Sequence, residues 1–297
     1  MFTKTEVHVI CTMGTEEGVL VGAAVSLSLL GIPPNLLSIL LILRAKQPKS
    51  TTTYFLLNLA IADIVNLLVS LLIVILKCLS IYNENDQWTI DAAAKAVANV
   101  TLALIALERY NGLVKTMAPF VNMGKGKVKI ILGVTWSVCI SYFVFALGIM
   151  NKGDKTIFQD LHYTFCSLLI YALPLVVVGY CYGKILKGVA LEGTILAQNP
   201  ANETAMEEKK RFIRIMVVVA VVFMACNLPA VVVKILLVAD QDVTVSRGLK
   251  NTLMLLACIS SVVNPYIYGL HSKRYREQLR ELFRCEHSED EVMNVHV

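Results

Sequence analysis

Four polar residues interrupt long apolar stretches of the chain and could form a buried polar cluster. Asp63 lies within the sequence LLNLAIADIVNLLVS, and Asn35, Ser260 and Asn264 have similarly apolar surroundings. A charge in the middle of a bilayer costs about 2.5–3.5 kcal/mol on insertion scales, so it needs a partner or a function. A carboxylate that faces amide and hydroxyl groups could hold water or a cation. It could equally form a hydrogen-bonded network that fixes helix packing, and the two interpretations are compatible.

A second candidate is the consecutive triplet Glu108, Arg109 and Tyr110, which ends a stretch rich in alanine, valine and leucine. Arg109 can pair with the neighbouring Glu108 or turn toward another acceptor. Two alternative pairings for one partly buried charge would make a two-state element. The other interpretation is that an arginine at a helix end simply extends its side chain to the membrane surface.

Three prolines lie inside apolar stretches and predict kinks. Pro174, Pro229 and Pro265 each lack the backbone N–H that an α-helix needs, so each leaves one carbonyl without its helical donor. In a membrane, water and neighbouring side chains can satisfy that carbonyl, which makes the kinks candidate hinges. Asn264 directly precedes Pro265, and we expect its side chain to serve this purpose.

Asp91 and Lys95 are two charged residues in the most polar of the long apolar stretches. At their i, i+4 spacing on a helix, the two side chains can form an ion pair that neutralises both charges. They could instead belong to a pocket for a zwitterionic or other polar ligand.

Long apolar helices are needed to position all of these residues, and the composition supplies them. Of 297 residues, 56% are hydrophobic and 16% are charged, and the mean hydropathy is +0.65. Soluble proteins carry about 25% charged residues, so lipid is the expected solvent. The stretches long enough to span a bilayer are about 18–43, 53–80, 88–113, 128–150, 163–188, 211–239 and 248–270. The predicted fold class is an all-α membrane protein with a bundle of seven transmembrane helices.

The charges between these stretches orient the bundle. Lysine and arginine cluster after the first, third, fifth and seventh stretches, whereas acidic residues prevail in the opposite set of segments. The positive-inside rule then places the N-terminus outside the cell and the C-terminus in the cytoplasm. We expect an extracellular N-terminus at 1–17, a transmembrane domain at 18–270 and a cytoplasmic segment at 271–297. The basic residues are spread over short loops, which excludes nucleic acid as an expected partner.

Two cytoplasmic segments have a recognisable character. Residues 190–210 predict a flexible loop. Residues 272–284 predict an amphipathic helix that lies on membrane lipid, with Tyr275, Leu279 and Leu282 on its apolar face. Cys285 follows this helix and is either palmitoylated or an unmodified thiol. The eight cysteines form no CxxC pair, so no metal site of the zinc type is expected.

Motifs along the chain match those of one receptor family in order and spacing. The matching residues are Asn35, Asp63 in Leu59-Ala60-Ile61-Ala62-Asp63, Glu108-Arg109-Tyr110, Trp136, Pro174 with Tyr182 eight residues later, Phe223, Cys226-Asn227-Leu228-Pro229, and the NPxxY motif Asn264-Pro265-Tyr266-Ile267-Tyr268. Over roughly residues 20–285 the chain resembles the rhodopsin-like (class A) G-protein-coupled receptors, with an opsin-like or orphan character.

The resemblance implies a plasma-membrane receptor that passes an extracellular small-molecule or peptide signal to a heterotrimeric G protein. A ligand would change the packing of a transmission group made of Pro174, Phe223, Asn227 and Pro229. The sixth stretch would swing outward at its cytoplasmic end, and a G-protein α subunit would insert a helix into the opened cavity. The coupling and switch residues would be Glu108, Arg109, Tyr110, Tyr182, Asn264, Pro265 and Tyr268. A sodium ion near Asp63 is also implied.

The extracellular half departs from the family pattern. Asn227 replaces the family's tryptophan, and Cys258 replaces the lysine that binds retinal in opsins, so covalent retinal is not expected. Glu84 stands where the family has a disulfide cysteine, which leaves Cys11 and Cys78 as an alternative pair. Asp91 occupies the position that binds the ligand's ammonium in amine receptors. The candidate ligand-pocket residues are Asp91, Lys95, Cys166, Asn227, Lys234 and Cys258.

Two other classes of membrane protein are compatible with several apolar helices. A seven-helix transporter or proton pathway could use Asp63, Asp91 and Lys95, although the last stretch carries no lysine at mid-depth to bind retinal, as microbial pumps need. A membrane-embedded hydrolase needs histidine and aspartate clusters within the membrane, and the five histidines lie at the ends of stretches or in loops. An enzymatic function is therefore not expected.

Overall fold

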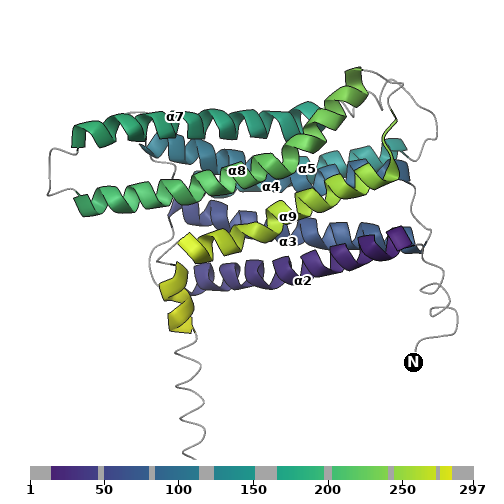
Figure 1. The fold of residues 1–297 in the computed structure, drawn as a ribbon, viewed down its shortest axis with the longest axis horizontal. Helices are drawn as coiled ribbons and strands as arrows, with labels where there is room; N and C mark the ends of the chain where they lie inside the picture. The colour runs from purple at the N-terminus through teal and green to yellow at the C-terminus, as the bar shows by residue number, and fades with distance from the viewer. Residues whose placement is uncertain are drawn as a thin grey trace, which may run out of the picture.

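Helices make up almost all of the chain that the computed structural model describes, which is residues 15–45, 50–79, 84–113, 124–150, 166–196, 203–239, 244–271 and 275–282. The elements are α2 (Thr15–Arg44), α3 (Thr51–Cys78), α4 (Glu84–Leu113), α5 (Lys125–Met150), the π-helix η2 (Cys166–Ala172), α7 (Leu173–Leu196), α8 (Glu203–Ala239) and α9 (Arg247–His271). Residues 275–282 form a further short helix. Within these ranges there is no β-strand, so the predicted all-helical character is confirmed. The long helices lie side by side, and consecutive ones run in opposite directions (Figure 1).

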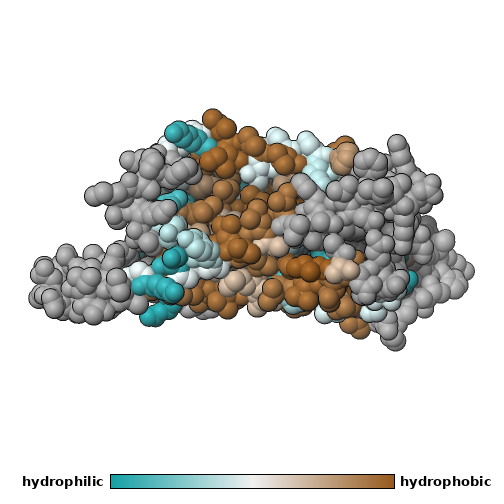
Figure 2. Space-filling model, turned by 90° about the horizontal axis from the view of Figure 1, so that it is seen from above, coloured by the Kyte–Doolittle hydropathy of each residue, from teal (hydrophilic) through white to brown (hydrophobic). Residues whose placement is uncertain are grey.

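The exposed surface of the bundle is apolar, as expected for a protein surrounded by lipid. Five helical segments of the described chain are long and apolar enough to cross a membrane, namely Gly18–Arg44, Thr51–Cys78, Lys125–Phe145, Leu169–Gly188 and Val217–Leu237. Large side chains such as Val19, Leu29 and Val176 are exposed, which water would disfavour. Figure 2 shows hydrophobic residues across the middle of the visible face and hydrophilic residues toward one end. The two remaining long elements, α4 and α9, carry more polar side chains.

The helix boundaries differ from the predicted ones mainly on one side of the bundle. Residues 190–210 were expected to form a flexible loop, but α7 continues to Leu196 and α8 begins at Glu203. That prediction is therefore wrong for all but residues 197–202, which lie outside the described chain. Glu, Lys, Ala and Met, which favour helices, dominate the start of α8 and explain the extension. Of the predicted helix at 272–284, the described residues 275–282 are helical, and the others lie outside the described chain.

Six of the long helices form a closed ring, and α5 lies outside it. The ring runs from α2 to α3, α4, α7, α8 and α9, and α9 packs back against α2. Only 6% of the most apolar part of α5 is buried, and this helix packs against α3 and α4. A hydrogen-bonded chain holds it there. Trp136 Nε1 donates to Asn58 Oδ1 over 2.8 Å, and the Asn58 amide donates to Thr101 of α4 over 2.8 Å.

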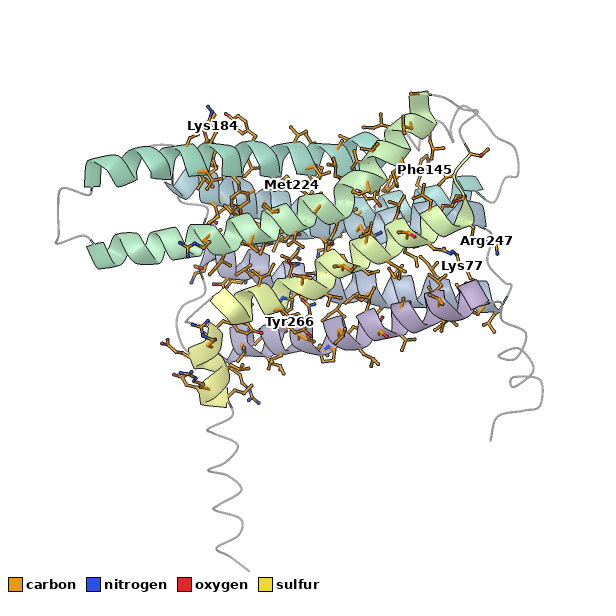
Figure 3. All side chains as sticks on the ribbon, viewed as in Figure 1. Lys77, Phe145, Lys184, Met224, Arg247 and Tyr266 are labelled. Atoms are coloured by element: carbon orange, nitrogen blue, oxygen red, sulfur yellow. The ribbon has the colours of Figure 1, made fainter. Side chains whose placement is uncertain are left out.

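Helices α2 and α9 satisfy each other's proline-freed carbonyls. Pro34 in α2 cannot donate to the Leu30 carbonyl, and the Tyr266 hydroxyl of α9 donates to that oxygen over 2.9 Å. Tyr266 reaches from α9 toward α2 (Figure 3). In return, Pro265 frees the Ser261 carbonyl of α9, and the Asn35 amide of α2 donates to it over 3.1 Å. The donor on each helix directly follows a proline, so the two kinks fit together.

A third proline follows the same rule on the other side of the ring. Pro174 lies just beyond η2 and has no N–H for the Ile170 carbonyl. The Asn99 side chain of α4 donates to that carbonyl over 3.0 Å, and Asn99 is 3% exposed. The expectation that Asn264 would satisfy the carbonyl freed by its own neighbour Pro265 is wrong, because Asn35 does so from another helix.

Candidate functional site

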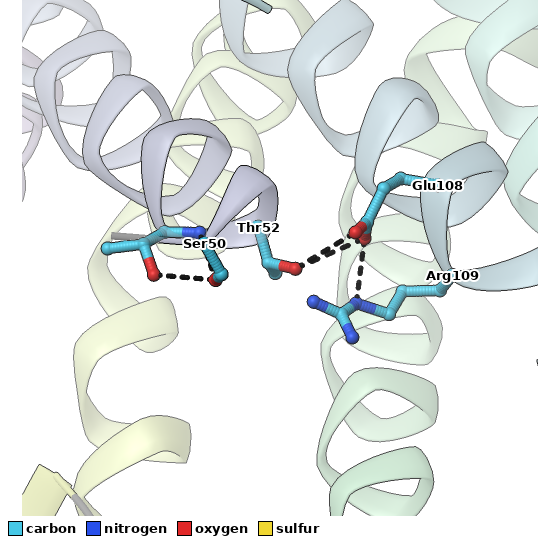
Figure 4. Close-up of polar contacts among 5 residues, drawn as sticks. Ser50, Thr52, Glu108 and Arg109 are labelled. Atoms are coloured by element: carbon cyan, nitrogen blue, oxygen red, sulfur yellow. Dashed lines mark hydrogen bonds and ion pairs between the residues drawn. The ribbon is translucent and has the colours of Figure 1, made fainter. Parts of the chain in front are cut away.

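The triplet that begins at Glu108 forms a compact ionic group where the end of α4 meets the start of α3. The Arg109 Nε atom lies 2.9 Å from Glu108 Oε2, and both side chains are about one-fifth exposed, at 21% and 22%. The Thr52 hydroxyl, in the first turn of α3, donates to both carboxylate oxygens of Glu108 at 3.1 and 3.2 Å (Figure 4). The predicted Glu108–Arg109 pair is therefore present, and Thr52 fixes its carboxylate from a second helix.

The tyrosines predicted to act with Arg109 have different environments. Tyr182 of α7 is 7% exposed and lies within electrostatic range of Arg109. It lines a small cavity between α4, α7 and α8 together with Phe223. Tyr110 packs edge-on against Tyr180, with ring centroids 6.0 Å apart. Tyr268 belongs to α9, but its side chain lies outside the described chain. Tyr182 thus lies in the interior beside the cavity, and its role as a second acceptor for Arg109 stays a prediction.

The polar cluster predicted around Asp63 forms between α3 and α9. Asn264 donates from Nδ2 to Asp63 Oδ2 over 2.8 Å, and Asp63 is 2% exposed. The Ser261 side chain hydrogen-bonds to the same carboxyl group and accepts a bond of 3.1 Å from Asn66 Nδ2. The serine of this cluster is therefore Ser261, and the prediction of Ser260 is wrong.

Ser260 and Asn35 lie beside the Asp63 group rather than in it. The Ser260 hydroxyl donates to the Ala257 carbonyl of its own helix over 2.7 Å. Adjacent positions on a helix point about 100° apart, so one serine faces α3 while the other does not. Asn35 is 1% exposed and binds backbone carbonyls of Gly31 and Ser261 at 2.9 and 3.1 Å. It thus connects α2 to the backbone of α9.

The predicted transmission residues lie in the interior of the ring, but the hydrogen bonds recorded for them are local. Phe223 and Asn227 are 3% and 1% exposed. The Asn227 amide donates to the Phe223 carbonyl over 2.9 Å, within α8. Pro229 lies two residues later in the same helix, and Pro174 begins the α-helical part that follows η2.

The candidate ligand-pocket residues divide into two groups. Lys95 and Lys234 are 3% and 6% exposed, and the Lys234 Nζ atom lies 4.2 Å from the centroid of the Tyr171 ring. Cys258 is 2% exposed and belongs to an apolar cluster with Leu67 and Val262, on the far side of the ring from η2. The structure therefore does not bring Cys258 together with the two lysines.

Several predictions fall on parts of the chain that are not described. Helix α4 includes Asp91 and η2 includes Cys166, but their side chains lie outside the described set, so the Asp91–Lys95 ion pair stays a prediction. Cys11 and Cys285 lie outside the described residues altogether, so the Cys11–Cys78 disulfide and the palmitoylation of Cys285 also stay predictions. The described part holds no group of three or more His, Cys, Asp and Glu side chains that could bind a metal.

Besides Ser261, sequence reasoning missed four residues that complete these groups. Thr52, Asn66 and Asn99 are neutral polar residues in apolar helices, and Tyr266 was treated only as a variable position of its motif. Asn66 could have been predicted from helical spacing, because it follows Asp63 by three residues and therefore lies on the same face of the helix. The prolines offered a signal for Asn99 and Tyr266, because each freed carbonyl demands a donor from another helix.

Comparisons with known proteins identify the family. Residues 34–268 match the model of the seven-transmembrane receptor (rhodopsin) family, so the chain belongs to that family. The human (Homo sapiens) neuropeptide Y receptor type 2 is 24% identical over 312 residues, which cover 92% of this chain and 78% of the relative. The mouse (Mus musculus) substance-K receptor is 25% identical over 303 residues, covering 89% and 74%. The human substance-P receptor is 22% identical over 282 residues, covering 84% and 67%.

Membership in this family settles the broad class. The chain is a receptor and a multi-pass membrane protein, and it is not an enzyme. The resemblance inferred from the Asp63, Arg109 and NPxxY motifs is therefore confirmed at the level of the family.

Proposed function

We propose that this receptor crosses the plasma membrane seven times and couples an extracellular ligand to heterotrimeric G proteins. The family match and the seven long helical units support this topology, with α4 and α9 as the two polar spans near the centre of the bundle. The side with the ends of α2 and α4 is cytoplasmic, as the basic segments there predict. A polar span is tolerated where it faces other helices rather than lipid.

The observation that carries the proposal is the group of Thr52, Glu108 and Arg109. Arg109 is held by the Glu108 carboxylate, and Thr52 of a second helix fixes the position of that carboxylate. Tyr182 offers an alternative acceptor in the interior. An arginine with two sets of partners is a two-state element, which a ligand can bias only by binding one state better.

The change of partner at Arg109 accompanies an outward movement of the cytoplasmic end of α8. Pro229 interrupts the backbone hydrogen bonds of α8, so the helix can bend there without breaking further bonds. Outward movement widens the small cavity lined by Tyr182 and Phe223, and Arg109 turns toward it. The opened cavity then accepts a helix of the G-protein α subunit.

The ligand is a peptide that binds the extracellular half. The name of the neuropeptide Y receptor type 2 indicates a neuropeptide ligand for that relative. In this chain the buried polar residues Lys95, Asn227 and Lys234 lie in the extracellular half of α4 and α8, where the ligand would bind. The remaining candidates are Asp91 and Cys166, whereas Cys258 has an apolar environment on the opposite side.

A sodium ion near Asp63 fits the donor set of the polar cluster. Asp63 supplies a buried carboxylate, and Ser261 supplies a hydroxyl oxygen. The Asn66 Oδ1 atom is buried and has no hydrogen-bond partner in the described chain, although it lies one turn from Asp63. Oxygen ligands of this kind suit a hard cation. The ion would supply positive charge between α3 and α9 and would favour the state in which these helices are held together.

The short helix at 275–282 lies on the cytoplasmic membrane surface. The Tyr275 hydroxyl and the Ser38 hydroxyl are hydrogen-bonded over 3.0 Å, and Arg276 donates to the Gly269 carbonyl over 3.4 Å. Burial raises the pKa of Tyr275 above its ordinary value, so this hydroxyl stays protonated at physiological pH. Cys285 follows this helix in the sequence, and its palmitoylation would anchor the docked helix further.

The test is nucleotide exchange on G proteins co-reconstituted with the full chain in lipid nanodiscs. The wild-type chain should accelerate GTPγS binding by one or more Gα classes, and Arg109→Ala should abolish this while leaving surface expression unchanged. Arg280→Ala is the matched control, because Arg280 is an exposed arginine on the short helix at the same end. Normal exchange by Arg109→Ala would contradict the proposal.

The same preparation distinguishes the receptor from a transporter. The chain reconstituted in liposomes should carry no proton or sodium flux under an imposed gradient. Flux that Asp63→Asn removes, together with no nucleotide exchange on any Gα class, would favour the ion-pathway alternative. For the sodium site, Asp63→Asn should remove any sodium dependence of the thermal stability of the purified chain, and unchanged sodium dependence would exclude Asp63 as the ligand.

A further inference from the structure

Helix α7 carries a row of exposed side chains that changes from apolar to aromatic to cationic along its length. Leu173, Val176 and Tyr180 are 51%, 67% and 56% exposed. Lys184 and Lys187 are also exposed, and spacings of three or four residues place all five side chains on one face of the helix. The apolar span of α7 ends one residue after Lys187, so the two lysines lie at the edge of the membrane. The row therefore matches the order of groups in one leaflet, from hydrocarbon through the interface to the headgroups.

The side chain of Lys184 is turned back toward the apolar part of this row. Its Nζ atom lies 5.7 Å from the centroid of the Tyr180 ring, one helical turn earlier, and Figure 3 shows Lys184 on the outer side of α7. Side chains on a helix point toward its N-terminus, which in α7 leads away from the nearer aqueous end. The tyrosine face offsets part of the desolvation of the ammonium group. Neither Lys184 nor Lys187 has a carboxylate within ion-pair distance among the described residues, so that part of the chain offers these charges no anion.

Helix α4 extends the same surface beside α7. Tyr110 packs edge-on against Tyr180, with ring centroids 6.0 Å apart, and brings a second phenol ring beside the first. Leu107 lies one turn earlier on α4 and is 40% exposed, so apolar surface continues from the tyrosines toward the membrane interior. Phenol rings, with one apolar and one polar end, favour the boundary between hydrocarbon and headgroups. The α4–α7 surface thus consists of Leu107 and Tyr110 of α4 with Leu173, Val176, Tyr180, Lys184 and Lys187 of α7.

A phospholipid with a net negative headgroup has the chemistry that this surface fits. Its phosphate would accept hydrogen bonds from the two lysines, its ester region would lie beside the tyrosines, and an acyl chain would cover the leucines and the valine. We propose that the α4–α7 surface binds an anionic phospholipid of the cytoplasmic leaflet. That leaflet is the one rich in anionic lipids, and each lysine near it attracts them. The inference rests on the topology proposed above only for the choice of leaflet.

The test is native mass spectrometry of the full chain in detergent micelles, titrated with lipid. The two probes are phosphatidylglycerol and phosphatidylcholine with identical acyl chains, because both carry a phosphate but only the first keeps a net negative charge. The measured quantity is the apparent Kd of the first bound lipid. The wild-type chain should bind phosphatidylglycerol at least about fivefold more tightly, which is the usual contribution of one lysine at an anionic surface.

Single substitutions assign this preference to the α4–α7 surface. Lys184→Gln should weaken phosphatidylglycerol binding about fivefold and leave phosphatidylcholine binding unchanged, whereas Lys184→Arg should retain the preference. Tyr180→Leu keeps an apolar side chain but removes the ring beneath the ammonium group, so it should also reduce the preference. Lys127→Gln is the matched control, because Lys127 is an exposed lysine at the same end of the bundle on α5, which packs against α3 and α4. It should change both constants by less than about twofold, since it acts only through screened, longer-range attraction. Thermal unfolding of every variant shows that the fold is intact.

The outcomes separate this inference from its alternatives and from the proposed function. Equal affinity for the two lipids in the wild-type chain, or equal losses for Lys184→Gln and Lys127→Gln, would overturn the inference. Glycerophosphoglycerol, the soluble headgroup without acyl chains, should not displace the bound lipid, and displacement would show that a free phosphate ester suffices and would also overturn it. None of these readouts requires a G protein or an agonist. A lipid preference without nucleotide exchange on any Gα class would leave the inference standing and refute G-protein coupling, whereas exchange without that preference would do the reverse.

Discussion

Removing the Tyr266 hydroxyl tests whether the kinks of α2 and α9 hold each other. The Tyr266→Phe variant keeps the ring and deletes the donor to the Leu30 carbonyl, which is 2.9 Å away. Hydrogen bonds between membrane helices average about 0.6 kcal/mol and reach about 1.7 kcal/mol. The Leu30 carbonyl has no helical donor, because Pro34 lacks an N–H, and a carbonyl left unsatisfied away from water costs about 1–3 kcal/mol, as it would on the lipid-facing surface of α2. We therefore expect a loss of about 1–2 kcal/mol in the free energy of unfolding.

The assay is equilibrium unfolding in mixed micelles titrated with a denaturing detergent. Tyr54→Phe serves as the control, since the Tyr54 ring contacts Lys129 at 5.7 Å and the variant retains that ring. Asn35→Ala removes the donor to the Ser261 carbonyl, which Pro265 frees, and should also lower the free energy of unfolding. Because both bonds join the same two helices, the double variant should deviate from additivity. A loss for Tyr266→Phe no larger than that for Tyr54→Phe would refute this reasoning.

Two further substitutions test other contacts. Thr52→Ala removes both hydrogen bonds to Glu108 and should raise ligand-independent nucleotide exchange several-fold; exchange at or below the wild-type rate would show that Thr52 does not restrain the switch. Gly31→Ala should lower the unfolding free energy by about 1–3 kcal/mol through overpacking, because the added Cβ would lie 2.5 Å from Leu67 Cδ1. Gly22→Ala on the same helix meets nothing within 4 Å and should be neutral or stabilising, so equal effects of the two alanines would exclude tight packing at Gly31.

The apolar spans and the Glu108–Arg109 ion pair were the most predictable parts. Hydropathy and charge placed the long helices to within a few residues at most ends, because lipid demands a fixed length of apolar chain. The Glu108–Arg109 pair and the Asp63–Asn264 hydrogen bond followed from residue types that cannot remain alone inside a membrane. In these cases the cost of an unpaired polar group is large enough to dictate a partner.

The choice among equivalent partners was not predictable. Ser260 and Ser261 are adjacent and chemically identical, and only the rotation of α9 decides which one faces Asp63. The donors to the proline-freed carbonyls come from other helices, and their identity depends on crossing angles that a linear pattern does not encode. Asn264 was the nearest donor in the sequence for the carbonyl that Pro265 frees, but its amide N–H donates to Asp63 instead.

The extension of α8 has a different cause. The start of α8 contains helix-forming residues, so its backbone is already helical before the apolar stretch begins. The end of α7 contains Gly188, Gly193 and Thr194, which disfavour a helix, so propensity does not explain its extension.

Helix α8 should move outward at its cytoplasmic end when a G protein binds. Pulsed electron paramagnetic resonance measures this movement directly as the distance between two spin labels. The labels replace Arg214 of α8 and Lys127 of α5, which are both exposed near that end. In nanodiscs, addition of nucleotide-free G protein to the wild-type chain should shift the distance distribution between the labels to longer values, and GTPγS should reverse the shift. The Arg109→Ala variant should show no such shift. An unchanged distribution in the wild-type chain, with bound G protein demonstrated in the same sample, would contradict the account.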